Sequence, residues 1–176
     1  DAYCRDISVK IRSHLEIKRK QGQYIGNYVS YGYRKCDDDK HKIEIDTYAA
    51  NVVKDIFRMK LQGMSQDAIA CKLNENGILC PADYKKSEGS NYQTSFKIKD
   101  KSGWSSTTVR RILTNEIYIG NLVQGKHTTP NHKVKKMYVK DESEWVRIEK
   151  NHEAIVSERD FELVQRLLAM DTRTAP

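Results

Sequence analysis

The clearest cluster of residues that could do chemistry is a run of four hydroxyl side chains followed by two arginines. Its members are Ser105, Ser106, Thr107, Thr108, Arg110 and Arg111. Short hydroxyl side chains near a helix N-terminus can approach a phosphate, because backbone N–H groups already point outward there. An arginine can grip a phosphate, or read guanine O6 and N7 with two hydrogen bonds. The stretch is a candidate nucleic-acid reader, and an ordinary surface helix with polar outer residues is the alternative.

Two further basic segments could contact phosphates. One is the arm at 18–20 (KRK), and the other is a lysine-rich loop at 125–136 (GKHTTPNHKVKK). The basic candidates in and around them are Arg12, Lys18, Arg19, Lys20, Arg34, Lys126 and His127. Four tyrosines interleaved with glycines beside the arm could stack on unpaired bases. They are Tyr24, Tyr28, Tyr31 and Tyr33, and we favour packing within the domain for them.

Catalytic chemistry is not indicated by any motif in the sequence. There is no glycine-rich phosphate loop, zinc-protease HExxH motif or nucleophile elbow. His127 and His132 stand at ligand spacing, but they fall in a loop, where solvated histidines are the favoured interpretation. The aspartates at 37–39 could chelate a hard cation, although a solvated turn is favoured. We therefore predict no catalytic residue, no metal site and no cofactor in this chain.

The four cysteines do not form a recognisable framework. Cys4, Cys36, Cys71 and Cys80 contain no CxxC pair, and their spacings of 32, 35 and 9 match no zinc pattern. We expect reduced thiols in a cytoplasmic protein, some of them buried as small apolar residues.

Charge is distributed unevenly along the 176 residues. The formal net charge is +7, but residues 141–176 contain nine acids and five bases, which leaves +11 on residues 1–140. Such an excess favours phosphate-rich partners, and lysines that only aid solubility are an equal alternative. No apolar run approaches the roughly 18 residues of a membrane span, and no leader marks secretion. We expect no membrane partner, and the start at Asp1 suggests a fragment or a processed product.

The elements that position these residues can be predicted from spacing and caps. Residues 1–21 have an apolar stripe at helical spacing (Tyr3, Ile7, Ile11, Leu15) before Gly22. Asp46, Ser65, Ser105 and Ser157 are placed to cap further helices. The first two of these helices would end at Gly63 and Gly77, with residues 68–70 and 73 inward in the second. In the third, Val109, Ile112 and Leu113 form the apolar face.

The remaining stretches predict short strands and one long loop. Strands are expected at 42–45, 117–124, 137–139 and 144–148, after a connector at 22–35, and a polar loop at 81–103. The fold class is therefore α+β: a mostly helical domain with a small antiparallel sheet, preceded by a long N-terminal helix.

Five segments in this order resemble the recombinase domain of the large serine recombinases. They are SYGYRK at 30–35, IFRMKLQGMS at 56–65, IACKLNENGI at 69–78, WSSTTVRRILTNEIYIGNLVQGK at 104–126 and HEAIVSERDFELVQRLL at 152–168. Members of that family have an N-terminal catalytic domain with a serine nucleophile, a long linking helix, the recombinase domain and a zinc ribbon. The segment at 81–103 departs from the usual pattern of the family as an insertion.

The resemblance implies both the domain boundaries and the role of the chain. Residues 1–22 would be the C-terminal part of the linking helix, 23–170 the DNA-binding recombinase domain, and 171–176 a frayed tail. The arm would lie near the minor groove by the crossover site, and the helix at 105–114 would enter the adjacent major groove. The implied partners are double-stranded DNA at attachment sites and further copies of the full-length protein, from dimer to tetramer, in the cytoplasm.

Three other functions remain open at this point. The chain could be a free-standing regulator or RNA-binding protein. It could be a structural interaction module with an incidental basic surface. It could also be a nuclease with unrecognised carboxylates.

Overall fold

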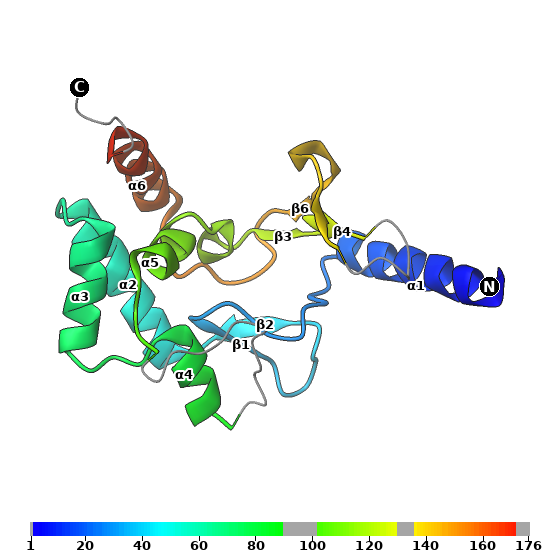
Figure 1. Ribbon diagram of the computed structural model, residues 1–176, viewed down its shortest axis with the longest axis horizontal. Coiled ribbons are helices and arrows are strands. Elements are labelled where there is room, and N and C mark those ends of the chain that lie inside the picture. Colours follow the sequence, from blue (N-terminus) through cyan, green and yellow to red (C-terminus); the bar gives the residue numbers. More distant parts are fainter. Residues whose placement is uncertain (1, 90–101, 130–135, 172–176) are drawn as a thin grey trace. The chain divides into compact units, whose positions relative to one another are not determined.

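The computed structural model describes residues 2–89, 102–129 and 136–171, which form two compact units (Figure 1). Unit 1 comprises residues 1–29, 33–45 and 116–154. Unit 2 comprises residues 30–32, 46–115 and 155–176. The expected fold class is confirmed: the described residues contain six α-helices and short antiparallel strands, and the first element is a long helix.

Unit 2 contains five helices, and capping side chains define the starts of four of them. The helices are α2 (Thr47–Leu61), α3 (Gln66–Glu75), α4 (Pro81–Ser87), α5 (Ser106–Leu113) and α6 (Glu158–Asp171). All four predicted caps are confirmed, since the side chains of Asp46, Ser65 and Ser105 each accept a hydrogen bond of 3.2 Å from the backbone N–H three residues on. Ser157 does the same at 3.1 Å. Each cap contributes about 1 kcal/mol to stability.

The core of unit 2 lies where these helices pack on one another. Helix α3 packs on α5, and α2 packs on α3, α5 and α6 (Figure 1). The buried side chains include Val53, Ile56, Ile69, Leu73, Val109, Leu113 and Val164. The inward face predicted for α3 is wrong at Ala68, which is exposed. That residue lies in the first turn of α3, where its N–H is bound by the Ser65 cap.

The expected loop at 81–103 is wrong in its first part, because it begins with helix α4. Pro81 occupies the first helical position, where its lack of an N–H is harmless. The hydroxyl of Tyr84 donates to Oδ2 of Asp46 at 2.8 Å, which attaches α4 to the start of α2. Asp83 accepts a hydrogen bond from Ser102, and this bond is the main cause of the lowered pKa of its carboxyl. Residues 90–101 lie outside the described residues.

Unit 1 combines helix α1 (Ala2–Lys20) with short strands. The strands are β1 (Tyr33–Lys35), β2 (Ile43–Ile45), β3 (Leu122–Gln124), β4 (His127–Thr128), β5 (Tyr138–Val139) and β6 (Val146–Ile148). Within the described ranges they form three two-stranded antiparallel sheets: β1 with β2, β3 with β6 and β4 with β5. Register pairs are Arg34 with Glu44, Val123 with Arg147, and His127 with Val139.

The predictions for two segments of unit 1 need correction: the strand at 117–124 and the connector at 22–35. The strand expected at 117–124 is wrong in its first half, where η1 (Glu116–Ile119) is a 3-10 helix. Neighbouring Ile117 and Tyr118 are both buried, so the alternation of a half-buried strand is absent. The connector at 22–35 in turn ends in β1, because Tyr33 is buried and its hydroxyl donates to the backbone of Ile117 and Glu153.

Helix α1 is confirmed, and its apolar stripe is exposed over most of its length. Tyr3 is 77% exposed, Ile7 40% and Ile11 54%, and only Leu15 is half-buried. The end of the helix is held instead by its polar neighbours. Nδ2 of Asn151 donates to the carbonyl of Gly22 at 2.9 Å, and the Gln124 amide bridges the carbonyl of Gln23 and the N–H of Ile25. The expected frayed tail at 172–176 lies outside the described residues.

Replacing Gly120 by alanine should lower the stability of unit 1 by about 2–3 kcal/mol. Gly120 has a φ of +88°, and a Cβ there would lie 2.8 Å from the backbone oxygen of His152. Gly125→Ala is the matched control, because its φ of +76° is similar but its nearest neighbour, a carbon of Arg19, would be 3.7 Å away. Chemical denaturation followed by circular dichroism measures both, and equal losses would show that the contact with His152 is immaterial.

Acidification below about pH 6.5 should destabilise unit 1 through His152. Nε2 of His152 lies 2.7 Å from the carbonyl of Ile117, and Nδ1 is buried without a hydrogen-bond partner among the described residues. Burial lowers the pKa of this imidazole, so the unfolded chain binds more protons and stability falls as the pH drops. In His152→Gln the melting temperature should depend less on pH between pH 7 and about pH 5. An unchanged slope in this variant would assign the titration to another group.

Candidate nucleic-acid interface

Helix α5 is held at its start by Trp104, which is 5% exposed. Its indole Nε1 donates to the carbonyl of Ile78 at 2.9 Å. Its backbone is bound on both sides by the Asn74 amide, which accepts from the Trp104 N–H at 2.8 Å and donates to its carbonyl at 3.0 Å. These bonds attach the residue before the α5 cap to the end of α3, so the orientation of α5 is defined at its N-terminus.

The two faces of α5 separate as the sequence predicts. Val109, Ile112 and Leu113 are buried, whereas Arg110 and Arg111 are exposed. Residues four apart lie above one another on a helix, so Ser106 with Arg110 and Thr107 with Arg111 make two adjacent rows. Neither arginine has an ion-pair partner among the described residues. Both guanidinium groups are therefore available to a ligand.

The four hydroxyls of this segment are not equivalent. Oγ of Ser105 accepts from the N–H of Thr108 and lies 3.0 Å from the Thr108 hydroxyl, so these two side chains bind each other. Thr107 is exposed and Ser106 half-buried, and both lie beside the open N–H groups of the first turn. Ser106 and Thr107 are thus the hydroxyls best placed for an outside ligand.

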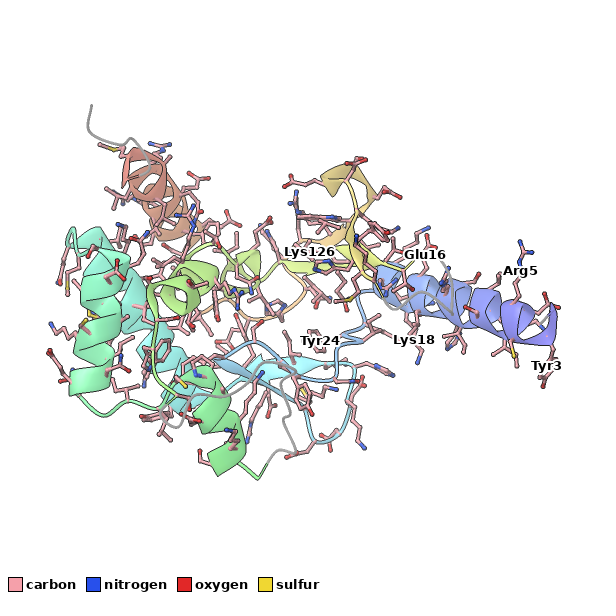
Figure 2. All side chains as sticks on the ribbon, viewed as in Figure 1. Tyr3, Arg5, Glu16, Lys18, Tyr24 and Lys126 are labelled. Carbon is pink, nitrogen blue, oxygen red and sulfur yellow. The ribbon has the colours of Figure 1, made fainter. Side chains whose placement is uncertain are left out.

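The basic arm is divided between opposite sides of α1. Lys18 lies 3.3 Å from Nε2 of His41, and Lys20 forms an ion pair of 3.0 Å with Glu16. Glu16 and Lys18 extend from opposite sides of the helix (Figure 2). Arg34 pairs with its cross-strand neighbour Glu44 at 2.8 Å. Lys18, Lys20 and Arg34 therefore already have partners within unit 1, in contrast to the arginines of α5.

The other four basic candidates lie by the β4–β5 hairpin. Arg12, Arg19 and His127 line a shared pocket. Lys126 directly precedes His127 in the chain, and its Nζ lies 4.7 Å from the centre of the Trp145 ring. The predicted residues thus form two groups: the α5 group in unit 2 and the α1–hairpin group in unit 1.

Lys140 and Thr129 also line the pocket, although neither was predicted from the sequence as a site residue. Lys140 lies opposite Lys126 in the β4–β5 pairing, because its N–H donates to the carbonyl of Lys126. Pairing of these two strands would have pointed to Lys140. Packing, rather than stacking on bases, is confirmed for Tyr31 and Tyr33, which are both 5% exposed.

The described residues contain no group of three or more histidine, cysteine or acidic side chains that could hold a metal ion. The described helices include none with the length and apolar character needed to cross a membrane.

Comparisons with known proteins agree with the resemblance found in the sequence. A family model described as Recombinase matches residues 47–170. One similar solved structure comes from a study of the sequence requirements of the Listeria innocua prophage attP site, with a TM-score of 0.54 and 18% identity over 93% of this chain and 56% of that one. Another, described as the crystal structure of an LSR–DNA complex, has a TM-score of 0.55 and 17% identity over 95% of this chain and 42% of that one. At this identity the similarity establishes the fold, and the chain spans about half the length of these structures.

Proposed function

Because the chain belongs to the Recombinase family, we propose that it is the DNA-binding domain of a large serine site-specific recombinase. In this role it recognises attachment-site duplex DNA in the cytoplasm during the integration or excision of a mobile element. Strand exchange requires a catalytic domain outside this sequence, and copies of the full-length protein assemble from dimer to tetramer. The free-standing regulator considered above is not favoured by this family membership.

The observation that carries the proposal is the outer surface of α5. It presents two exposed arginines without acidic partners among the described residues, two accessible hydroxyls and a helix N-terminus. The start of this helix is held by Trp104. This set suits a duplex, because arginine reads guanine in the major groove and the N-terminal N–H groups suit a phosphate. Both similar solved structures also concern DNA, one as a complex and one as a prophage attP site.

Binding to duplex DNA should weaken steeply with salt, and Lys20→Ala should weaken binding to every sequence equally. The logarithm of the binding constant should fall with the logarithm of salt at a slope of about −0.9 per neutralised phosphate. Lys20 lies on α1 beside Glu16, where its side chain offers charge but no paired donors for a base. Fluorescence anisotropy with duplexes of several sequences, in a salt series, measures both quantities.

The same assay can contradict the proposal. Failure to bind any duplex at low salt would favour the structural module, and tighter binding to RNA would favour the RNA-binding protein. Cleavage of supercoiled DNA with Mg²⁺, abolished by chelator, would instead indicate a nuclease. A loss confined to one sequence in Lys20→Ala would contradict the role of the arm.

A further inference from the structure

A pocket of about 330 Å³ lies between α1 and the β4–β5 hairpin of unit 1. Its lining residues are Arg12, Leu15, Glu16, Arg19, His127, Thr128, Thr129, Met137 and Lys140. Arg12 and Arg19 are seven residues apart, two turns of one helix, and so lie on the same face of α1. The last residue of the apolar stripe, Leu15, also lines the pocket, and the two arginines beside it bring two guanidinium groups to one cavity.

The donors of these two arginines are only partly used. One nitrogen of Arg12 (Nη2) donates to the carbonyl of Thr129 at 3.2 Å, which joins the helix to the hairpin and leaves the other N–H groups of the guanidinium. Nε of Arg19 is buried and has no acceptor among the described residues. A buried donor without an acceptor is costly unless a ligand completes it. The described residues therefore supply no acceptor for Nε of Arg19, and a ligand in the pocket could supply one.

The charge in the pocket also favours an anion. Glu16 is the one acid among the described lining residues, and it is paired with Lys20 at 3.0 Å. This hydrogen bond is the main cause of the lowered pKa of its carboxyl. Lys140 is in turn paired with Glu144 at 3.5 Å. Among the described residues, Arg12 and Arg19 have no ion-pair partner to compensate their charges. Guanidinium groups suit the oxygens of a phosphate, which can accept two parallel hydrogen bonds.

We infer that this pocket holds one backbone phosphate of the bound duplex, with Arg12 and Arg19 as its shared ligands. The inference rests on the proposed function and adds to it a specific contact in unit 1. The phosphate would fix the register of unit 1 on the DNA without reading a base. Both ligands come from α1, and Arg12 is also bonded to the carbonyl of Thr129, so the phosphate would be bound where the helix meets the hairpin.

The test uses a duplex that the intact chain selects from a random pool. Each phosphate of this duplex is replaced in turn by an uncharged methylphosphonate. One position should weaken wild-type binding about tenfold or more, and that position should lose its effect in Arg12→Ala and in Arg19→Ala. Lys10→Ala removes a charge from the same helix outside the pocket, and it should retain the full effect. Melting curves, with Arg12→Lys and Arg19→Lys as charge-conserving variants, separate loss of a contact from loss of folding.

Salt dependence distinguishes one shared phosphate from two separate ones. If the arginines share one phosphate, the double variant should reduce the slope by about 0.9 in total, because a single phosphate is no longer neutralised. A reduction of about 1.8 in the double variant would overturn the shared site. Stabilisation by inorganic phosphate, without any methylphosphonate effect, would assign the pocket to a free anion and overturn the DNA assignment. If no duplex is selected at all, the proposed function itself fails, whereas a selected duplex without the predicted position contradicts only the pocket.

Discussion

Trp104→Ala should destabilise unit 2 by about 3–5 kcal/mol and abolish duplex binding. The substitution removes a 5% exposed ring, its edge-on contact with Tyr31 at 5.6 Å and the hydrogen bond to the carbonyl of Ile78. The part-buried carbonyl of Ile78 then loses its donor, which adds to the cost of the cavity. Since Trp104 directly precedes the Ser105 cap, the start of α5 loses its attachment to α3 as well.

Trp104→Phe is the matched variant, because it keeps most of the ring and removes the indole N–H. It should lose about 1–3 kcal/mol and retain binding. Urea denaturation followed by far-ultraviolet circular dichroism gives the two free energies of unfolding, and anisotropy gives the affinity. Equal stability of wild type and Trp104→Ala would show that Trp104 does not hold α5 in place.

Arg110→Ala and Arg111→Ala should differ in kind, with one of them relaxing specificity by about 1–3 kcal/mol at a single base pair. That corresponds to a loss of discrimination of about 5- to 150-fold. Both side chains are exposed and without ion pairs in the described parts of the chain, but they point about 100° apart around α5. A duplex seated on one row therefore offers base edges to one arginine and its backbone to the other. The second variant should lower affinity for every sequence.

Competition against duplexes with one base pair varied at a time separates the two effects. Arg159→Ala, an exposed arginine on α6, is the charge-matched control and should preserve every preference. If both α5 variants also keep the wild-type preference at all positions, α5 does not read the sequence. The basic segment at 125–136 would then be the next candidate.

The helices of this protein are largely determined by local sequence. Asp46, Ser65, Ser105 and Ser157 cap the helices predicted for them, because a cap and its helix involve only neighbouring backbone groups. The inner face of α5 was predictable for the same reason, since helical spacing alone places 109, 112 and 113 together. The family could likewise be recognised from the order of five segments, and the match over residues 47–170 confirms it.

The features that only the tertiary structure determined depend on contacts between residues that are distant in the chain. The 3-10 helix at Glu116–Ile119 and the strand at Tyr33–Lys35 depend on contacts between these two segments, such as the bond from Tyr33 to Ile117. The start of α5 depends on Asn74, thirty residues before Trp104. Arg12 meets Thr129 across 117 residues, so no local pattern predicts their pocket. Local propensity acts on neighbours, whereas these contacts arise from burial and hydrogen bonding after the chain has folded back on itself.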